Sequence, residues 1–114
     1  MSAAAERWLR ERLPGAPPRL LEAMAAAVAE ASGPEADAAA VPDALAEAAL
    51  RLYREVLGGT GGRDDALPLL AADALLTHAL QAQAELDPTG VADFAARWGG
   101  AERLGDLLGS RGAE

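Results

Sequence analysis

Residues with chemically useful side chains collect in one stretch of the sequence, LLAADALLTHALQAQAE at residues 69–85. Its Asp73, Thr77, His78 and Gln81 offer a carboxylate, a hydroxyl, an imidazole and an amide, which are groups used in acid–base catalysis and metal binding. Helical geometry separates two of them, because at 100° per residue His78 lies about 140° around the axis from Asp73. A single helix therefore cannot bring this imidazole and this carboxylate into contact.

The same wheel arranges most of these groups as one polar stripe. Its members follow at four-residue steps, as on the solvent-exposed face of an amphipathic helix. They are Asp73, Thr77, Gln81 and Glu85. The opposite arc is apolar and holds Leu69, Ala72, Leu75, Leu76, Ala79, Leu80, Ala82 and Leu86. His78 lies at the edge of the stripe, and Gln83 is a polar group facing the apolar arc. Gln83 there indicates a buried hydrogen bond or an interface.

This spacing argues against an enzyme that pairs His78 with Asp73 or Glu85. The chain has one histidine and no cysteine, so a transition-metal site would need carboxylates from other helices. We therefore predict no catalytic, cofactor-binding or metal-ligating residue.

A second stretch, GGTGGRDD at residues 58–65, has the glycines of a phosphate-binding loop. The nucleotide-binding version ends in Gly-Lys-Ser/Thr, and this chain contains no lysine. The glycines instead predict a turn between two helices, with Asp64 or Asp65 capping the second. The aspartate pair also lacks the third carboxylate of an Asp-Asp-x-x-Asp magnesium–diphosphate motif, because position 68 is proline.

Helical periodicity and Gly/Pro punctuation predict that these stretches belong to an all-α, single-domain bundle of five or six short helices. The expected helices run over about 3–13, from 18 to about 31, 42–57, 65–86 and 88–98, with a short last one at 104–108. No strand or dividing linker is indicated, so residues 1–114 form one domain with a glycine-rich turn at 58–63 and a frayed tail at 109–114.

Composition narrows the functional classes. The absence of cysteine excludes disulfides, thiolate catalysis and thiolate zinc sites, and the net charge of −8 argues against nucleic-acid binding. No apolar run approaches the roughly 18–20 residues that span a bilayer. The N-terminus lacks a signal-peptide layout, so we expect a cytoplasmic protein. The 30 alanines bury little area each, so we expect the bundle to complete its core against another subunit.

Two stretches resemble trans-isoprenyl diphosphate synthases. LRERLPGAPPRLLEAMAAAV at 9–28 is similar to the opening of that fold, in which a short helix, a Pro-rich turn and an LxEAM helix follow one another. DDALPLLAADALLTHAL at 64–80 is similar to the helix with a Gly-Asp-x-Leu-Leu segment, with Ala72 replacing the glycine and Asp73 as the aspartate. The two aspartate-rich motifs and the Gly-Lys-Arg-x-Arg-Pro segment of catalytic members are missing. The chain is therefore closer to the small, non-catalytic subunit of two-component hexaprenyl or heptaprenyl diphosphate synthases.

This resemblance implies a heteromer in which the present chain binds a catalytic large subunit and influences product chain length. The partner would supply the aspartates, Mg²⁺ and substrates, and the apolar face of the fourth helix would adjoin the partner or the growing chain. The candidate interface residues are Asp73, Leu76, Thr77, His78, Leu80 and Gln83. The alternative is an unrelated helical protein–protein interaction module or homodimeric adaptor.

Overall fold

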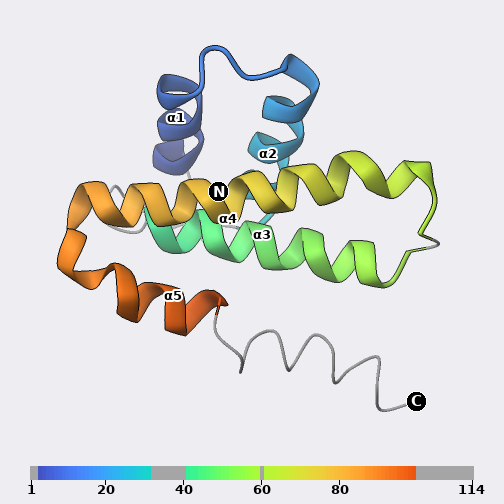
Figure 1. The fold of residues 1–114 in the computed structure, drawn as a ribbon. Coiled ribbons are helices and arrows are strands. Elements are labelled where there is room, and N and C mark those ends of the chain that lie inside the picture. Colours follow the sequence, from blue (N-terminus) through green and yellow to red (C-terminus); the bar gives the residue numbers. More distant parts are fainter. Residues whose placement is uncertain (1–2, 32–40, 60, 100–114) are drawn as a thin grey trace.

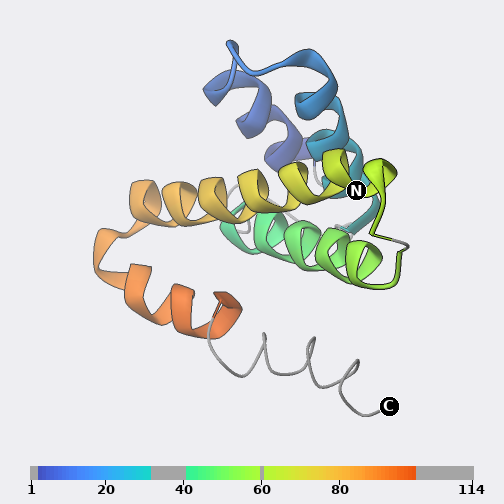
Figure 2. The ribbon, with the colours of Figure 1, turned by 45° about the vertical axis from the view of Figure 1, so that its right-hand side comes forward.

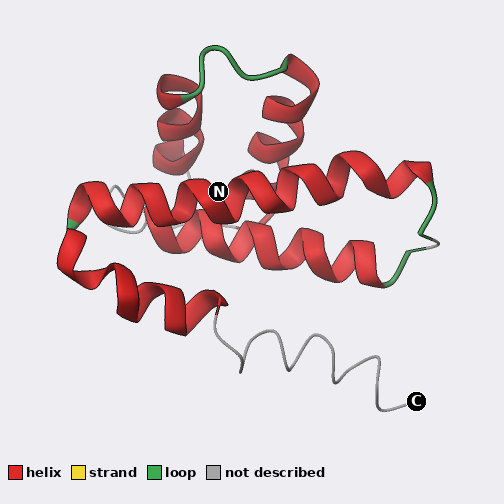
Figure 3. Ribbon diagram, viewed as in Figure 1, coloured by secondary structure: helices red, strands yellow, loops and turns green. Residues whose placement is uncertain are grey.

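The computed structural model describes residues 3–31, 41–59 and 61–99, and within these ranges it is all α, as predicted (Figure 3). The helices are α1 (Ala3–Arg12), α2 (Pro18–Ala31), α3 (Val41–Leu57), α4 (Ala66–Leu86) and α5 (Val91–Gly99). Two short 3-10 turns, η2 (Arg63–Asp65) and η3 (Pro88–Gly90), lead into α4 and α5. The helix expected at 104–108 and the tail at 109–114 lie outside the described residues.

The α3–α4 hairpin is the centre of the bundle. These two helices run antiparallel and make the most extensive contact of any pair, as Figure 1 shows. The α1–α2 hairpin stands across one side of this pair, and α5 lies on the other side (Figure 2). As a result, α4 is flanked by helices along much of its length.

Local sequence explains where the helices begin. Pro18 and Pro68 lie in the first turns of α2 and α4, where a missing N–H costs no intrahelical hydrogen bond. Asp87 caps η3, because its Oδ1 accepts hydrogen bonds from the Thr89 N–H (3.1 Å) and hydroxyl (2.6 Å). The predicted Asp87-Pro88 start of the fifth helix is confirmed, with one 3-10 turn before α5.

Alanine dominates the core. Of the 19 buried hydrophobic residues in the described part of the chain, 11 are alanines. Small side chains let helix axes approach closely, and α3 and α4 use them along their shared face. The larger buried side chains, which fill the space between helices, are Phe94, Leu9, Met24, Leu45, Leu75 and Val28.

The apolar arc of α4 is buried in the middle but not at its ends. Leu75 and Ala79 are fully buried, whereas Leu69 is 41 % exposed and Leu86 is 55 % exposed. Both leucines belong to the predicted apolar arc, but each lies near an end of the helix where the arc is exposed. The cause is length, since α4 has 21 residues and its main partner α3 has 17.

Candidate functional site

The polar stripe of α4 is present as predicted, and all four of its members are exposed. The Asp73 side chain bonds to α3, and the Thr77 side chain bonds to the Asp73 backbone. Asp73 Oδ1 accepts a hydrogen bond from the Tyr53 hydroxyl of α3, and the Thr77 hydroxyl donates to the Asp73 carbonyl oxygen at 2.9 Å. Partial burial and the Asp73 carboxylate together raise the pKa of Tyr53. Asp73 therefore joins α4 to α3.

The other half of the stripe connects α4 to α1. Gln81 Nε2 donates to Glu85 Oε2 at 3.3 Å, and Glu85 Oε1 accepts from Arg12 Nη2 at 2.8 Å and Nε at 3.2 Å. His78 Nδ1 lies 2.8 Å from Gln81 Oε1. The carboxylate can only accept, so it fixes the orientation of the Gln81 amide and assigns the Nδ1 proton to His78.

Aromatic contacts close this arrangement into a ring. The Trp8 and His78 ring centroids lie 6.3 Å apart with the planes tilted by 59°, and the Arg12 guanidinium lies 5.7 Å from the Trp8 centroid. We call these five residues, Trp8, Arg12, His78, Gln81 and Glu85, the α1–α4 network. It contains the chain's single histidine.

Charge in the network is balanced locally. Hydrogen bonding to Arg12 lowers the pKa of Glu85, with smaller contributions from Gln81 and Trp8 against an opposing effect of desolvation. The same hydrogen bond raises the pKa of Arg12. Each side chain of this ion pair is more than a third exposed, so water screens the pair and its effect on stability is small.

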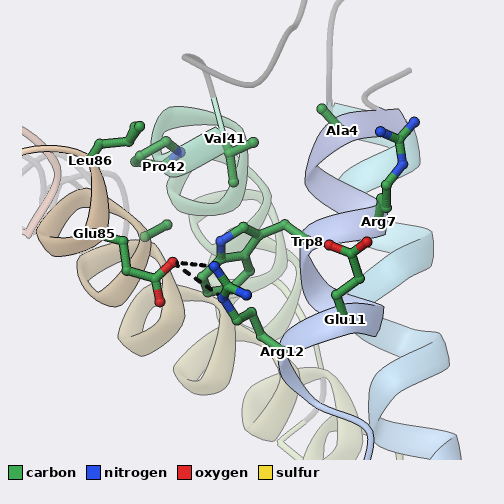
Figure 4. A pocket seen from close by; sticks show the side chains of 10 residues that line it. Ala4, Arg7, Trp8, Glu11, Arg12, Val41, Pro42, Glu85 and Leu86 are labelled. Carbon is green, nitrogen blue, oxygen red and sulfur yellow. Dashed lines mark hydrogen bonds and ion pairs between the residues drawn. The ribbon is translucent and has the colours of Figure 1, made fainter.

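A groove adjoins this network, between α1, the start of α3 and the end of α4 (Figure 4). Its volume is about 380 Å³. Trp8 and Arg12 reach from α1 toward Glu85, and Leu86 lies beyond it near Val41 and Pro42. We call this the α1/α4 groove; its lining residues are Ala4, Arg7, Trp8, Glu11, Arg12, Val41, Pro42, Ala82, Glu85 and Leu86.

The remaining predicted interface residues lie in other surroundings. Leu76 and Leu80 are half-buried against the core. Gln83 is half-buried, and its Nε2 donates to the Asp87 carbonyl oxygen at 3.3 Å. A Cβ on Gly90 would lie only 2.9 Å from Gln83 Nε2, so this amide packs tightly in the α4–η3 corner. Gln83 thus makes a hydrogen bond, but an exposed one instead of the buried bond that was one of the two alternatives.

The structure thus divides the six predicted interface residues among four places. Asp73 lies at the α3 contact with Thr77 bonded to its carbonyl oxygen, and His78 lies in the α1–α4 network. Gln83 lies at the α4–η3 corner, and Leu76 and Leu80 lie against the core. Sequence reasoning missed Trp8 and Arg12, because Arg12 and its partner Glu85 are 73 positions apart. The only sequence signal for them was that α1 carries one of four aromatic residues.

The glycine-rich turn binds the side-chain carboxylate of Asp65. Asp65 occupies the position before α4 without a side-chain capping bond, so the predicted capping by this residue is wrong in detail. Its Oδ2 instead accepts from the Gly61 N–H at 2.8 Å, and a Cβ on Gly59 would lie 2.7 Å from the same oxygen. The carboxylate thus points back to the turn and not to the first N–H groups of α4. An incoming phosphate would have to displace it.

In ranges 3–31, 41–59 and 61–99, no three His, Cys, Asp or Glu side chains are grouped so that they could hold a metal ion. None of the helices described there has the length and apolarity needed to cross a membrane.

The fold and the site define the chain as an all-α, single-domain bundle with a network that ties its first helix to its fourth. Compared with protein families, characterised proteins and solved structures, the chain gives no significant match.

Proposed function

We propose that this chain is a non-catalytic subunit that binds a catalytic polyprenyl diphosphate synthase and influences the length of its product. The α1/α4 groove would receive the partner. The proposal has two parts, partner binding and the identity of the partner, and they have different support.

The observation that carries partner binding is that Trp8 and the exposed Leu86 both line the α1/α4 groove. Tryptophan anchors in partly apolar pockets are a common source of binding energy between proteins. Leu86 is 55 % exposed at the end of α4, beside Val41 and Pro42. A partner side chain entering here would remove the leucine from water at a gain of about 25 cal/mol per Å².

The rim of the groove adds polar groups suited to orienting a partner. Arg7 and Glu11 are exposed and lie four positions apart on α1, and neither forms an ion pair within the described part of the chain. Rim charges of this kind affect association rate and orientation more than affinity.

The identity of the partner rests on the resemblance of residues 9–28 and 64–80 to the synthase family. These two stretches correspond to the last turn of α1 with most of α2, and to about the first two-thirds of α4. Each stretch contributes one residue to the α1–α4 network, Arg12 from the first and His78 from the second. Trp8, Gln81 and Glu85, which lie outside both stretches, connect these two residues. A docking surface next to this junction is consistent with a subunit that keeps the family's helices without its aspartate motifs.

The burial of α4 limits where such a partner could bind. Leu75 and Ala79 are already covered by the chain's own helices. The apolar face of α4 is therefore accessible to a partner chiefly at its two ends. Leu86 lies at the end that borders the groove.

Co-purification tests this function. A tagged chain, co-expressed with a polyprenyl diphosphate synthase from the same organism, should retain that synthase and shift its product-length distribution. If the synthase is not retained, and its activity and products are the same with and without the chain, the proposed partner is wrong.

A further inference from the structure

The N-terminal turns of α2 and α4 form a second apolar surface, far from the α1/α4 groove. A shallow recess, widely open to solvent and of about 430 Å³, lies there, lined by Pro18, Arg19, Glu22, Ala23 and Leu67. Leu70 follows Leu67 by three residues, so it lies on the same side of α4, and it is 58 % exposed. We call these six residues the α2/α4 corner.

The corner contains both halves of an apolar contact. Leu70 projects into solvent, and the neighbouring recess has an apolar floor of Pro18, Ala23 and Leu67. A two-fold interface uses the same patch on both molecules, so each patch must carry a projection and its matching recess. The α2/α4 corner meets this requirement within one chain.

The charged residues at the edge of the α2/α4 corner are also self-complementary, because the corner carries one positive and one negative side chain. Arg19 and Glu22 lie three positions apart on α2, on one side of the recess. Arg19 forms no ion pair within the described residues, whereas Glu22 Oε1 accepts from Arg10 at 2.9 Å. The Glu22 side chain is still 67 % exposed, which leaves room at its second oxygen for another guanidinium.

From this complementarity of shape and charge, we infer that two copies of the chain associate through the α2/α4 corner. Leu70 of each copy enters the recess of the other, and Arg19 of each copy pairs with Glu22 of the other. The surface is small, and interfaces below about 1,200 Å² are usually weak, so the dimer depends on concentration.

This association is compatible with the proposed function but does not rest on it. Leu70 and Leu86 are 16 positions apart on α4, a separation of about 24 Å along a helix at 1.5 Å per residue. A partner in the α1/α4 groove and a second copy at the α2/α4 corner therefore occupy different ends of the molecule (Figures 1 and 2).

Sedimentation velocity of the pure chain tests the dimer without any synthase present. The wild-type chain should shift from monomer toward dimer over micromolar to millimolar concentrations, and Leu70→Arg should stay monomeric. Leu86→Arg is the matched control, because it puts the same charge on a leucine of similar exposure at the other end of α4. Circular dichroism melting confirms that each variant is folded.

A charge-exchange experiment tests the geometry. Arg19→Glu and Glu22→Arg should each weaken the dimer alone, because each places like charges opposite one another. Mixing the two variants should restore it, since a mixed dimer has two opposite-charge pairs. A wild-type chain that stays monomeric throughout overturns the inference. A Leu70→Arg variant that dimerises like the wild type also overturns it. So does a mixture of Arg19→Glu and Glu22→Arg that forms no dimer under conditions in which the wild-type chain does.

Discussion

Arg12 of α1 and Glu85 of α4 are 73 positions apart in sequence, yet two nitrogens of the guanidinium donate to one carboxylate oxygen, at 2.8 and 3.2 Å. The pair connects the N-terminal hairpin to the central helix. It also forms one wall of the α1/α4 groove, because both residues line it. The shape of the proposed docking surface thus depends on a contact between α1 and the end of α4.

The Glu85 contact should make stability depend on pH in a defined direction. The folded pKa of Glu85 is lowered, chiefly by Arg12, so the unfolded chain binds a proton at higher pH than the folded chain does. The stabilisation is complete above the ordinary glutamate pKa of about 4.3 and is lost as pH falls through the lower folded value. In urea titrations, wild type should exceed Glu85→Gln in stability at pH 7, and the difference should shrink below pH of about 4. A difference that grows on acidification contradicts this assignment.

The only tyrosine of the chain gives a direct spectroscopic test of the α3–α4 contact. Burial first, and the Asp73 carboxylate second, raise the pKa of Tyr53. Its folded pKa exceeds the ordinary value of about 10, so the associated stability is present below that pH and is lost as pH rises through the folded value. Absorbance titration of the folded chain should show that Tyr53 ionises at a higher pH than an ordinary tyrosine. Asp73→Asn should move it toward, but not down to, the ordinary value.

Tyr53→Phe is the matching stability test. The variant keeps the ring and removes the hydroxyl that donates to Asp73. A hydrogen bond to a charged group contributes about 1.5–3 kcal/mol when buried, and an exposed carboxylate regains water, so we expect a loss of about 1 kcal/mol in urea denaturation. An unchanged free energy of unfolding would show that the contact adds nothing to stability.

An alanine at Gly61, in the glycine-rich turn, should destabilise the fold far more than an alanine at Gly15, in the turn between α1 and α2. Gly61 has φ of +78°, and Gly15 does not lie in the positive-φ region, while an added Cβ meets nothing within 4 Å at either. Gly61→Ala should therefore cost about 1–2 kcal/mol from backbone conformation alone. Gly15→Ala should be neutral or stabilise by about 0.4–1 kcal/mol through the unfolded chain. Equal effects of the two changes in chemical denaturation would contradict the conformation of the turn.

Much of the fold could be predicted because its signals are local. Pro18, Gly58 and Asp87-Pro88 set helix boundaries by backbone chemistry within a few residues. The structure places the helix ends within about one residue of the prediction when the 3-10 turn η3 is counted with α5. The polar stripe of α4 follows from the helical period and nothing else.

What could not be predicted depends on neighbours distant in sequence. A helical wheel treats every turn as equally covered, so it could not show that α4 extends beyond α3 and leaves Leu69 and Leu86 exposed. The backward turn of the Asp65 side chain required the position of the Gly61 N–H. The α1–α4 network required the hairpin of α1 and α2 to lie across α4, which no spacing within one helix encodes.

The most direct test of the proposed function is the affinity of the pure chain for a polyprenyl diphosphate synthase, measured for wild type, Leu86→Arg and Leu70→Arg. Leu86 borders the α1/α4 groove, and Leu70 has similar exposure away from it. We predict that wild type and Leu70→Arg bind equally and that Leu86→Arg binds about tenfold more weakly or worse, since an interface anchor is worth at least about 1.4 kcal/mol. No binding by the wild-type chain, or equal affinity of wild type and Leu86→Arg, would contradict the account.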